Sequence, residues 1–124
     1  MKILLAEDDQ NVLVITQLCL ERLGFHEVLS AVDGEQAVNM AMSTAFDLIL
    51  LDGIMPKKNG IDVAQELRAN GLLTPIIFLS AKSEEKDIQE FLKLGTGYIP
   101  KPFDPQTISQ RIEQILKAQG ARSA

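Results

Sequence analysis

Four places in this chain combine a short apolar run with a polar side chain that could do chemistry. They are the acidic triplet Glu7-Asp8-Asp9, the lone acid Asp52, the hydroxyl of Ser80 and the ammonium of Lys101. If the apolar runs are parallel strands, their carboxyl ends meet at one edge of the sheet, where open α/β folds bind ligands. Carboxylates, a hydroxyl and an ammonium at that edge predict a site for a hard cation and an anionic group.

The acids predict a magnesium site. Carboxylates that share a cleft raise one another's pKa unless a cation compensates them. Oxygen ligands without His or Cys favour Mg²⁺ over zinc or copper. If the first and third strands are neighbours, Glu7 and Asp8 lie close to Asp52. We expect Asp9 to cap the following helix instead.

Asp52 could serve as a ligand only, or as a nucleophile as well. A carboxylate can attack a phosphoryl group to form an acyl phosphate, and the protein then supplies positioning and charge neutralisation. The ammonium of Lys101 and the hydroxyl of Ser80 suit contacts with phosphoryl oxygens. Their joint placement after neighbouring strands favours this interpretation over local capping.

The elements that must position these groups follow from hydrophobic patterning. Continuous apolar runs predict buried strands at 3–6, 26–31, 47–51, 75–80 and 98–99. Helical spacing between them predicts five helices, the first with Val12, Ile15, Cys19 and Leu23 on its apolar stripe and the last ending near Ala118. We therefore predict an α/β, flavodoxin-like, doubly wound sheet of five parallel strands in the order 2-1-3-4-5.

Composition limits the classes of function. The length fits one domain, which we place at 1–118, with 119–124 as a flexible tail or the start of a linker. A net charge of -5 argues against direct nucleic-acid binding. The single cysteine, Cys19, excludes a disulfide within the chain and a thiolate metal site. No apolar run is long enough for a signal peptide or a membrane span, so we expect a cytoplasmic protein with no membrane partner.

Four segments resemble the receiver domain of two-component response regulators. They are "ILLAEDD", "DLILLDGIMPKKNG", "PIIFLSAKSEEKD" and "YIPKPF", which occur in the family's order and at family-like separations. The resemblance extends from residue 2 to about 118. It implies a chemotaxis-regulator-like phosphoacceptor switch in a phosphorelay, which catalyses its own phosphotransfer and slow dephosphorylation without being a conventional enzyme.

The resemblance also implies roles for single residues. Asp52 would accept a phosphoryl group from a sensor histidine kinase, a phosphotransfer protein or a small phosphodonor. Asp8 and Asp52 would bind Mg²⁺ directly, Glu7 mostly through water, and Ile54 through its backbone carbonyl. The output partner is not implied.

Three further residues match positions that, in the family, respond to phosphorylation. Ser80 and Lys101 would contact the phosphoryl oxygens, and Tyr98 would be the aromatic residue whose rotation follows activation. Lys101-Pro102 matches a bond that is usually cis in receivers. An edge-strand tyrosine with no switch role is the alternative for Tyr98.

The chain departs from the family pattern near the fourth helix. Gly53 stands where a larger side chain is common, Phe91 where a small one is common, and the turn Gly95–Tyr98 is one residue short. Because cores tolerate little extra volume, we expect the fourth helix, roughly 84–94, to be displaced or shortened relative to a typical receiver. A neutral local repacking, with Phe91 pointing to solvent, is the alternative.

Three other interpretations compete with the phosphoacceptor. A flavodoxin-like cofactor carrier would need hydroxyls and amides after the first strand, where this chain has repelling acids. A haloacid-dehalogenase-type phosphatase would need an acid two positions after Asp52, where Ile54 stands. A receiver-fold interaction module that acts without phosphorylation is the strongest rival, although every residue of the reactive set is present.

Overall fold

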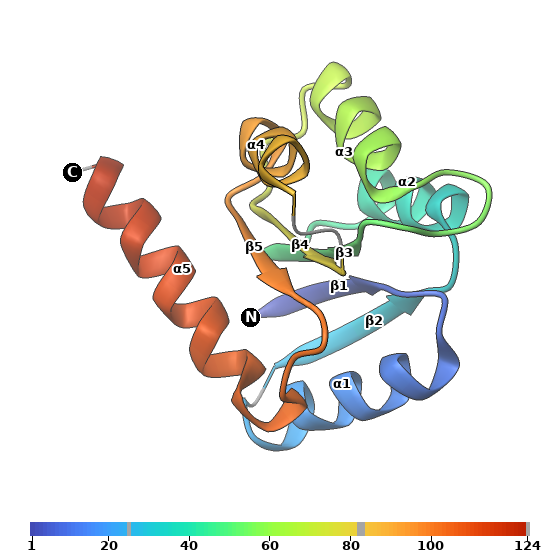
Figure 1. The fold of residues 1–124 in the computed structure, drawn as a ribbon. Coiled ribbons are helices and arrows are strands. Elements are labelled where there is room, and N and C mark those ends of the chain that lie inside the picture. The colour runs from blue at the N-terminus through green and yellow to red at the C-terminus, as the bar shows by residue number, and fades with distance from the viewer. Residues whose placement is uncertain (25, 82–83, 124) are drawn as a thin grey trace.

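The fold alternates strands and helices along the whole chain. The computed structural model describes residues 1–24, 26–81 and 84–123 (Figure 1). The strands are β1 (Lys2–Ala6), β2 (Glu27–Ala31), β3 (Leu48–Asp52), β4 (Ile76–Ser80) and β5 (Gly97–Pro100). The helices are α1 (Gln10–Arg22), α2 (Gly34–Ser43), α3 (Gly60–Ala69), α4 (Glu85–Leu94) and α5 (Ile108–Ser123), the last preceded by a 3₁₀ turn, η1 (Pro105–Thr107).

All strand pairs are parallel, and the sheet order is β2-β1-β3-β4-β5. The predicted fold class and strand order are thus confirmed. The chain leaves β1 toward β2 on one side and continues with β3 on the other, so the order reverses between β1 and β3. Because Ala6 is paired with Leu51, the residues that follow β1 lie beside the last residue of β3, Asp52.

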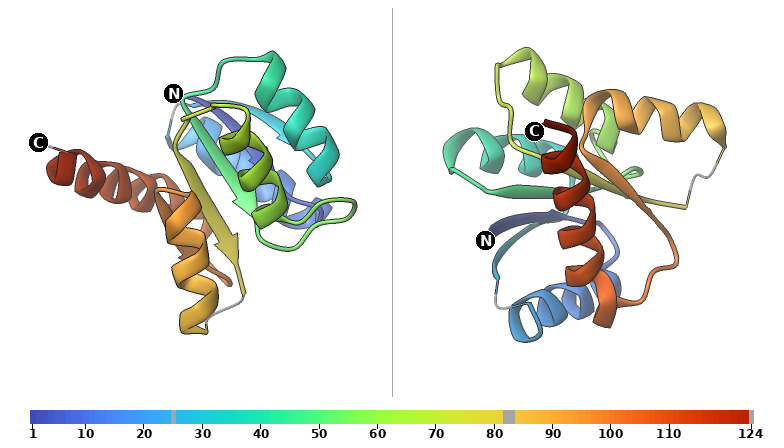
Figure 2. Two further views of the ribbon diagram at one scale, coloured as in Figure 1. Left: turned by 90° about the horizontal axis from the view of Figure 1, so that it is seen from above. Right: turned by 90° about the vertical axis from the view of Figure 1, so that its left-hand side faces the viewer.

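Helices cover both faces of the sheet and bury two apolar clusters. Residues of α2, α3 and α4 pack on one face, as in the buried Val38, Leu67 and Phe91. Residues of α1 and α5 pack on the other, as in Leu20 and Ile112. Figures 1 and 2 show these two helical layers, with the end of α5 extending away from the sheet.

Polar caps begin the helices nearest the carboxyl edge of the sheet. The side chain of Asp9 accepts the backbone N–H groups of Asn11 and Val12, so its predicted capping role is confirmed. Asp33 and Asn59 cap α2 and α3 in the same way. These caps place helix starts directly after the loops that follow β1, β2 and β3.

Two predictions about helices are wrong. The buried face of α1 carries Leu13, Thr16 and Leu20, whereas Ile15 and Leu23 of the predicted stripe are 51% and 57% exposed. The helix is apolar around most of its circumference, so periodicity alone does not select the face that meets the sheet. The last helix continues to Ser123, beyond the predicted end near Ala118, because no proline interrupts it.

Phe91, one of the three departures from the family pattern, lies in the interior of the protein. Its side chain is 2% exposed and belongs to the cluster under α4, so the alternative in which it points to solvent is wrong. Whether α4 is displaced relative to other receivers stays a prediction. Within the described ranges, none of the helices has the length and apolar character needed to cross a membrane.

Candidate functional site

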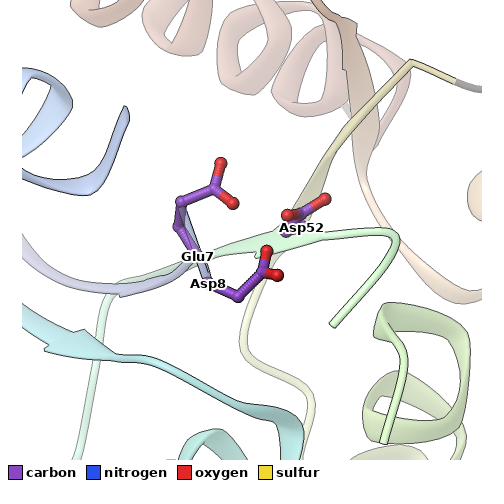
Figure 3. Close-up of side chains that lie close together, drawn as sticks. All are labelled: Glu7, Asp8 and Asp52. Atoms are coloured by element: carbon purple, nitrogen blue, oxygen red, sulfur yellow. The ribbon is translucent and has the colours of Figure 1, made fainter. Parts of the chain in front are cut away.

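Three carboxyl groups meet at the carboxyl edge of β1 and β3. Each of Glu7, Asp8 and Asp52 offers one oxygen, and these oxygens lie within 4.8 Å of one another. Figure 3 shows the three side chains directed toward a common point. Glu7 and Asp52 are buried and Asp8 is exposed, so the cluster is closed on the protein side and open to solvent on the other. The predicted convergence of these acids is therefore found.

Lys101 joins the acids from beyond the far strand. It follows β5, which is separated from β3 by β4, yet its Nζ lies 2.6 Å from Oε1 of Glu7 and 3.2 Å from Oδ2 of Asp52. Its side chain is 22% exposed. The peptide bond from Lys101 to Pro102 is cis, as the resemblance implied. The ammonium thus lies within ion-pair distance of both buried acids.

The pKa values of Asp52, Glu7 and Lys101 all depart from their ordinary values. Burial raises the pKa of Asp52 to about 8, and the hydrogen bond with Glu7 and its charge add to the rise. Burial would also raise the pKa of Glu7, but hydrogen bonds with Asp52 and Lys101 hold that pKa below its usual value. For Lys101, burial acts to lower the pKa, while Glu7 and Asp52 raise it overall. The site therefore holds an ion pair, Glu7 with Lys101, beside an acid that ionises with difficulty.

Ser80 ends β4, between the strands that lead to Asp52 and Lys101. It is 1% exposed. Its carbonyl oxygen accepts the backbone N–H of Lys101 at 2.9 Å and the hydroxyl of Tyr98 at 3.3 Å. The carbonyl oxygen of Ser80 is thus hydrogen-bonded both to Lys101, which contacts the acids, and to Tyr98 on β5.

The loop after Asp52 is held by its backbone. The N–H of Ile54 donates to Oδ1 of Asp52 at 3.2 Å, and the N–H of Gly60 donates to the carbonyl of Gly53 at 3.1 Å. A Cβ on Gly60 would lie 2.4 Å from the carbonyl oxygen of Asp52, so only glycine fits there. Sequence reasoning missed this role of Gly60, although its place directly after the cap Asn59 was a signal that the helix starts close to the strand.

Known proteins resemble this chain in sequence and in fold. The model of the response regulator receiver domain matches residues 3–113. The chain belongs to this family. The predicted resemblance is thereby confirmed, and with it a receiver domain of two-component signalling.

Individual relatives agree with the receiver assignment. The chain is 41% identical over 117 residues to the alkaline phosphatase synthesis transcriptional regulatory protein PhoP of Bacillus subtilis, covering 94% of this chain and 48% of that protein. It is 44% identical over 117 residues to the transcriptional regulatory protein CpxR of Escherichia coli, covering 94% and 49%. The receiver domain of the Francisella response regulator 1452 superposes with a TM-score of 0.86 at 30% identity, covering 94% of this chain and 97% of that one. This receiver chain spans about half the length of the curated relatives it matches.

Proposed function

We propose that this receiver domain is a Mg²⁺-dependent switch that accepts a phosphoryl group on Asp52. The observation that carries the proposal is the group around Asp52: a buried nucleophile, two further carboxylates within 4.8 Å and an ammonium at 3.2 Å. Phosphoryl transfer needs charge neutralisation and positioning more than covalent chemistry, and this group supplies both.

The donor set fits Mg²⁺. Asp8 and Asp52 would bind the ion directly, Glu7 through water and Ile54 through its backbone carbonyl. The cluster offers oxygen only, and its open side leaves room for the waters and phosphate oxygens that Mg²⁺ retains. When bound, the ion would supply positive charge to the acids and to the transferring phosphoryl group.

The transfer forms an acyl phosphate. A carboxylate oxygen of Asp52 forms the new bond to phosphorus while the bond from phosphorus to the donor breaks. The electron pair of that bond leaves with the imidazole nitrogen of a phosphohistidine, or with the acetate oxygen of acetyl phosphate. Lys101 and Ser80 are placed to contact phosphoryl oxygens. Slow hydrolysis by water would return Asp52 to its free carboxylate.

The response would travel from the phosphoryl group to the face carrying Tyr98. Phosphorylation changes the charge on Asp52 from at most one negative unit to about two, which can bias a two-state element. Ser80 is in contact through its backbone with both Lys101 and Tyr98. Tyr98 would therefore report the change, and an output partner of unknown identity would read the surface around it.

The proposed partners follow from the same chemistry. A sensor histidine kinase or a phosphotransfer protein would donate the phosphoryl group, and the setting would be the cytoplasm.

We propose 1–118 as the receiver unit, with 119–124 as a tail or the start of a linker. The net charge of -5 makes direct nucleic-acid binding by this domain unfavourable.

Acetyl phosphate provides the direct test. The protein is incubated with acetyl phosphate and Mg²⁺, and its intact mass is measured. We expect a gain of one phosphoryl group, which Asp52→Asn abolishes. Asp47→Asn is the matched control, because Asp47 is exposed and directly precedes the opposite end of β3.

The result also separates the proposal from its rival. Labelling of Asp52→Asn at the wild-type level would assign the phosphoryl group to another residue. A wild-type protein that is never labelled, by acetyl phosphate or by a histidine kinase, would favour the receiver-fold interaction module that acts without phosphorylation.

A further inference from the structure

Phe91 lies at the centre of an aromatic stack that links α4 to two strands. Its ring centroid is 4.7 Å from that of Phe78 on β4 and 5.5 Å from that of Tyr98 on β5. The interplanar angles of 27° and 14° make both contacts stacked. A shift of this ring therefore changes the surroundings of Tyr98 directly.

The same ring lies beside the space that a side chain on Gly53, the residue after Asp52, would fill. A Cβ built on Gly53 would lie 3.3 Å from Cζ of Phe91, 2.9 Å from Oγ of Ser80 and 3.1 Å from its Cβ. The volume that a side chain at position 53 would fill is thus bordered by the ring on one side and by the hydroxyl of Ser80 on the other. The bulk of Phe91 and the absence of a side chain at Gly53 are therefore complementary.

We propose that Phe91 is the positioning residue that transmits phosphorylation of Asp52 to α4 and Tyr98. The inference rests on the proposed function and adds the route of its response. Contact with a phosphoryl group on Asp52 turns the hydroxyl of Ser80 away from the volume above Gly53. Because protein interiors are close-packed, the ring of Phe91 moves into the vacated space. The ring carries α4 with it and changes the stacking on Tyr98.

Two features make this route depend on Phe91 and Gly53 in particular. Phe91 is 2% exposed, so its ring cannot respond by turning into solvent. Packed interfaces switch between discrete arrangements rather than deforming continuously, and a rigid ring between helix and strand suits such a switch. A side chain at position 53 would fill the space into which the ring has to move.

Tyr98 itself provides the readout. The chain has one tyrosine and no tryptophan, so intrinsic fluorescence excited at tyrosine wavelengths reports on Tyr98. Beryllofluoride with Mg²⁺ is used to mimic the phosphoryl group, and labelling by acetyl phosphate is measured in parallel by intact mass. The wild type is expected to show both labelling and a change in Tyr98 emission.

Two variants interrupt the route from opposite sides. Phe91→Leu removes the ring that moves, and Gly53→Ala fills the volume that would receive it. We expect both to gain one phosphoryl group, with a beryllofluoride-induced emission change at least about threefold smaller than that of the wild type. Phe46→Leu is the matched control, because Phe46 lies in the same apolar cluster but just before the amino end of β3. It should keep the full emission change.

The outcomes distinguish the two proposals. A labelled Phe91→Leu protein with the wild-type emission change would overturn the role of Phe91. If that variant does not fold, the same result for Gly53→Ala would overturn it. A wild-type protein without labelling would refute the proposed function itself, and the inference would fall with it. Loss of the emission change in Phe46→Leu as well would show that the readout follows core stability rather than this route.

Discussion

The ammonium of Lys101, which follows β5, lies 3.2 Å from Oδ2 of Asp52, the last residue of β3, although these two strands are not neighbours in the sheet. The same ammonium contacts Glu7, which follows β1. One cation therefore connects the ends of three strands. In the proposed function, this ammonium would balance charge at the acids before transfer and would contact a phosphoryl oxygen after it.

Lys101→Ala should separate metal binding from phosphotransfer. Removing a positive charge beside the carboxylates makes the site more negative, and a unit charge within a few ångströms contributes on the order of 1 kcal/mol or more. We expect Mg²⁺ to bind the variant at least as tightly as the wild type, while labelling by acetyl phosphate slows by at least about tenfold. Calorimetric titration with Mg²⁺ and intact mass against time measure the two effects.

Lys57→Ala is the matched control for Lys101. Lys57 is on the loop after Asp52, its side chain is 59% exposed and its nearest acid is Asp33. It should change neither the affinity for Mg²⁺ nor the labelling rate. A Lys101→Ala protein that binds Mg²⁺ more weakly than the wild type would contradict the role given to the ammonium.

Asp8→Asn should weaken metal binding and phosphotransfer together. Asp8 is the exposed acid of the cluster, so it faces the open side through which ion and donor would enter. Loss of one carboxylate charge should reduce Mg²⁺ affinity by about tenfold, equivalent to about 1.4 kcal/mol. Excess EDTA should have the same effect on labelling of the wild type. Undiminished labelling in EDTA would show that the transfer needs no divalent ion.

Asp9→Asn is the matched control for Asp8→Asn. Asp9 is the next residue, and its carboxylate caps α1 by accepting two backbone N–H groups. Asparagine caps helices about as well as aspartate. The variant should therefore keep both the stability of α1 and the binding of Mg²⁺, although it removes the same charge one residue away.

Ser80→Ala should leave the transfer largely intact and impair the response. The side chain of Ser80 borders the volume above Gly53, and its backbone contacts with Lys101 and Tyr98 do not depend on the hydroxyl. We expect Mg²⁺ binding as in the wild type, detectable labelling, and a reduced emission change of Tyr98 with beryllofluoride. Ser43→Ala, at the exposed end of α2, is the control. A full emission change in Ser80→Ala would contradict the switch role of its hydroxyl.

The sheet and the convergence of the acids could be predicted because both follow from local patterns. Apolar runs mark buried parallel strands, and parallel strands deliver the residues that follow them to one edge. Asp52 and the triplet at 7–9 are therefore brought together by strand order alone. The same reasoning placed Ser80 and Lys101 at this edge, but not the contact of Lys101 with Glu7, which depends on side-chain reach.

Packing between layers could not be predicted in the same way. The apolar side chains of α1 surround most of the helix, and the fit to the sheet rather than periodicity selects Leu13 and Leu20. Phe91 and Gly53 are visible as departures in the sequence, but the sequence does not show that a Cβ at position 53 would lie 3.3 Å from the ring of Phe91. The sequence alone allowed Phe91 to be exposed or buried, and only the tertiary arrangement decides between them.

Gly60→Ala should damage the site through the backbone. A Cβ at this position would lie 2.4 Å from the carbonyl oxygen of Asp52 and 3.0 Å from Cα of Gly53, so the start of α3 must move away from β3. Overpacking of this kind costs about 1–3 kcal/mol. Because the crowded carbonyl oxygen belongs to Asp52, we expect both a lower unfolding midpoint in urea and a labelling rate reduced by more than the loss of folded protein explains.

Gly71→Ala separates loss of stability from damage to the site. Gly71 follows the end of α3 and has φ of +81°, and a Cβ built on it has nothing within 4 Å, so alanine there is strained but displaces nothing. Adopting this left-handed conformation costs an L-residue about 1–2 kcal/mol. Gly71→Ala should therefore lower the unfolding midpoint and leave the labelling rate per folded molecule unchanged. Equal labelling by the two variants, after correction for the folded fraction, would show that the approach of α3 to β3 at Gly60 does not position Asp52.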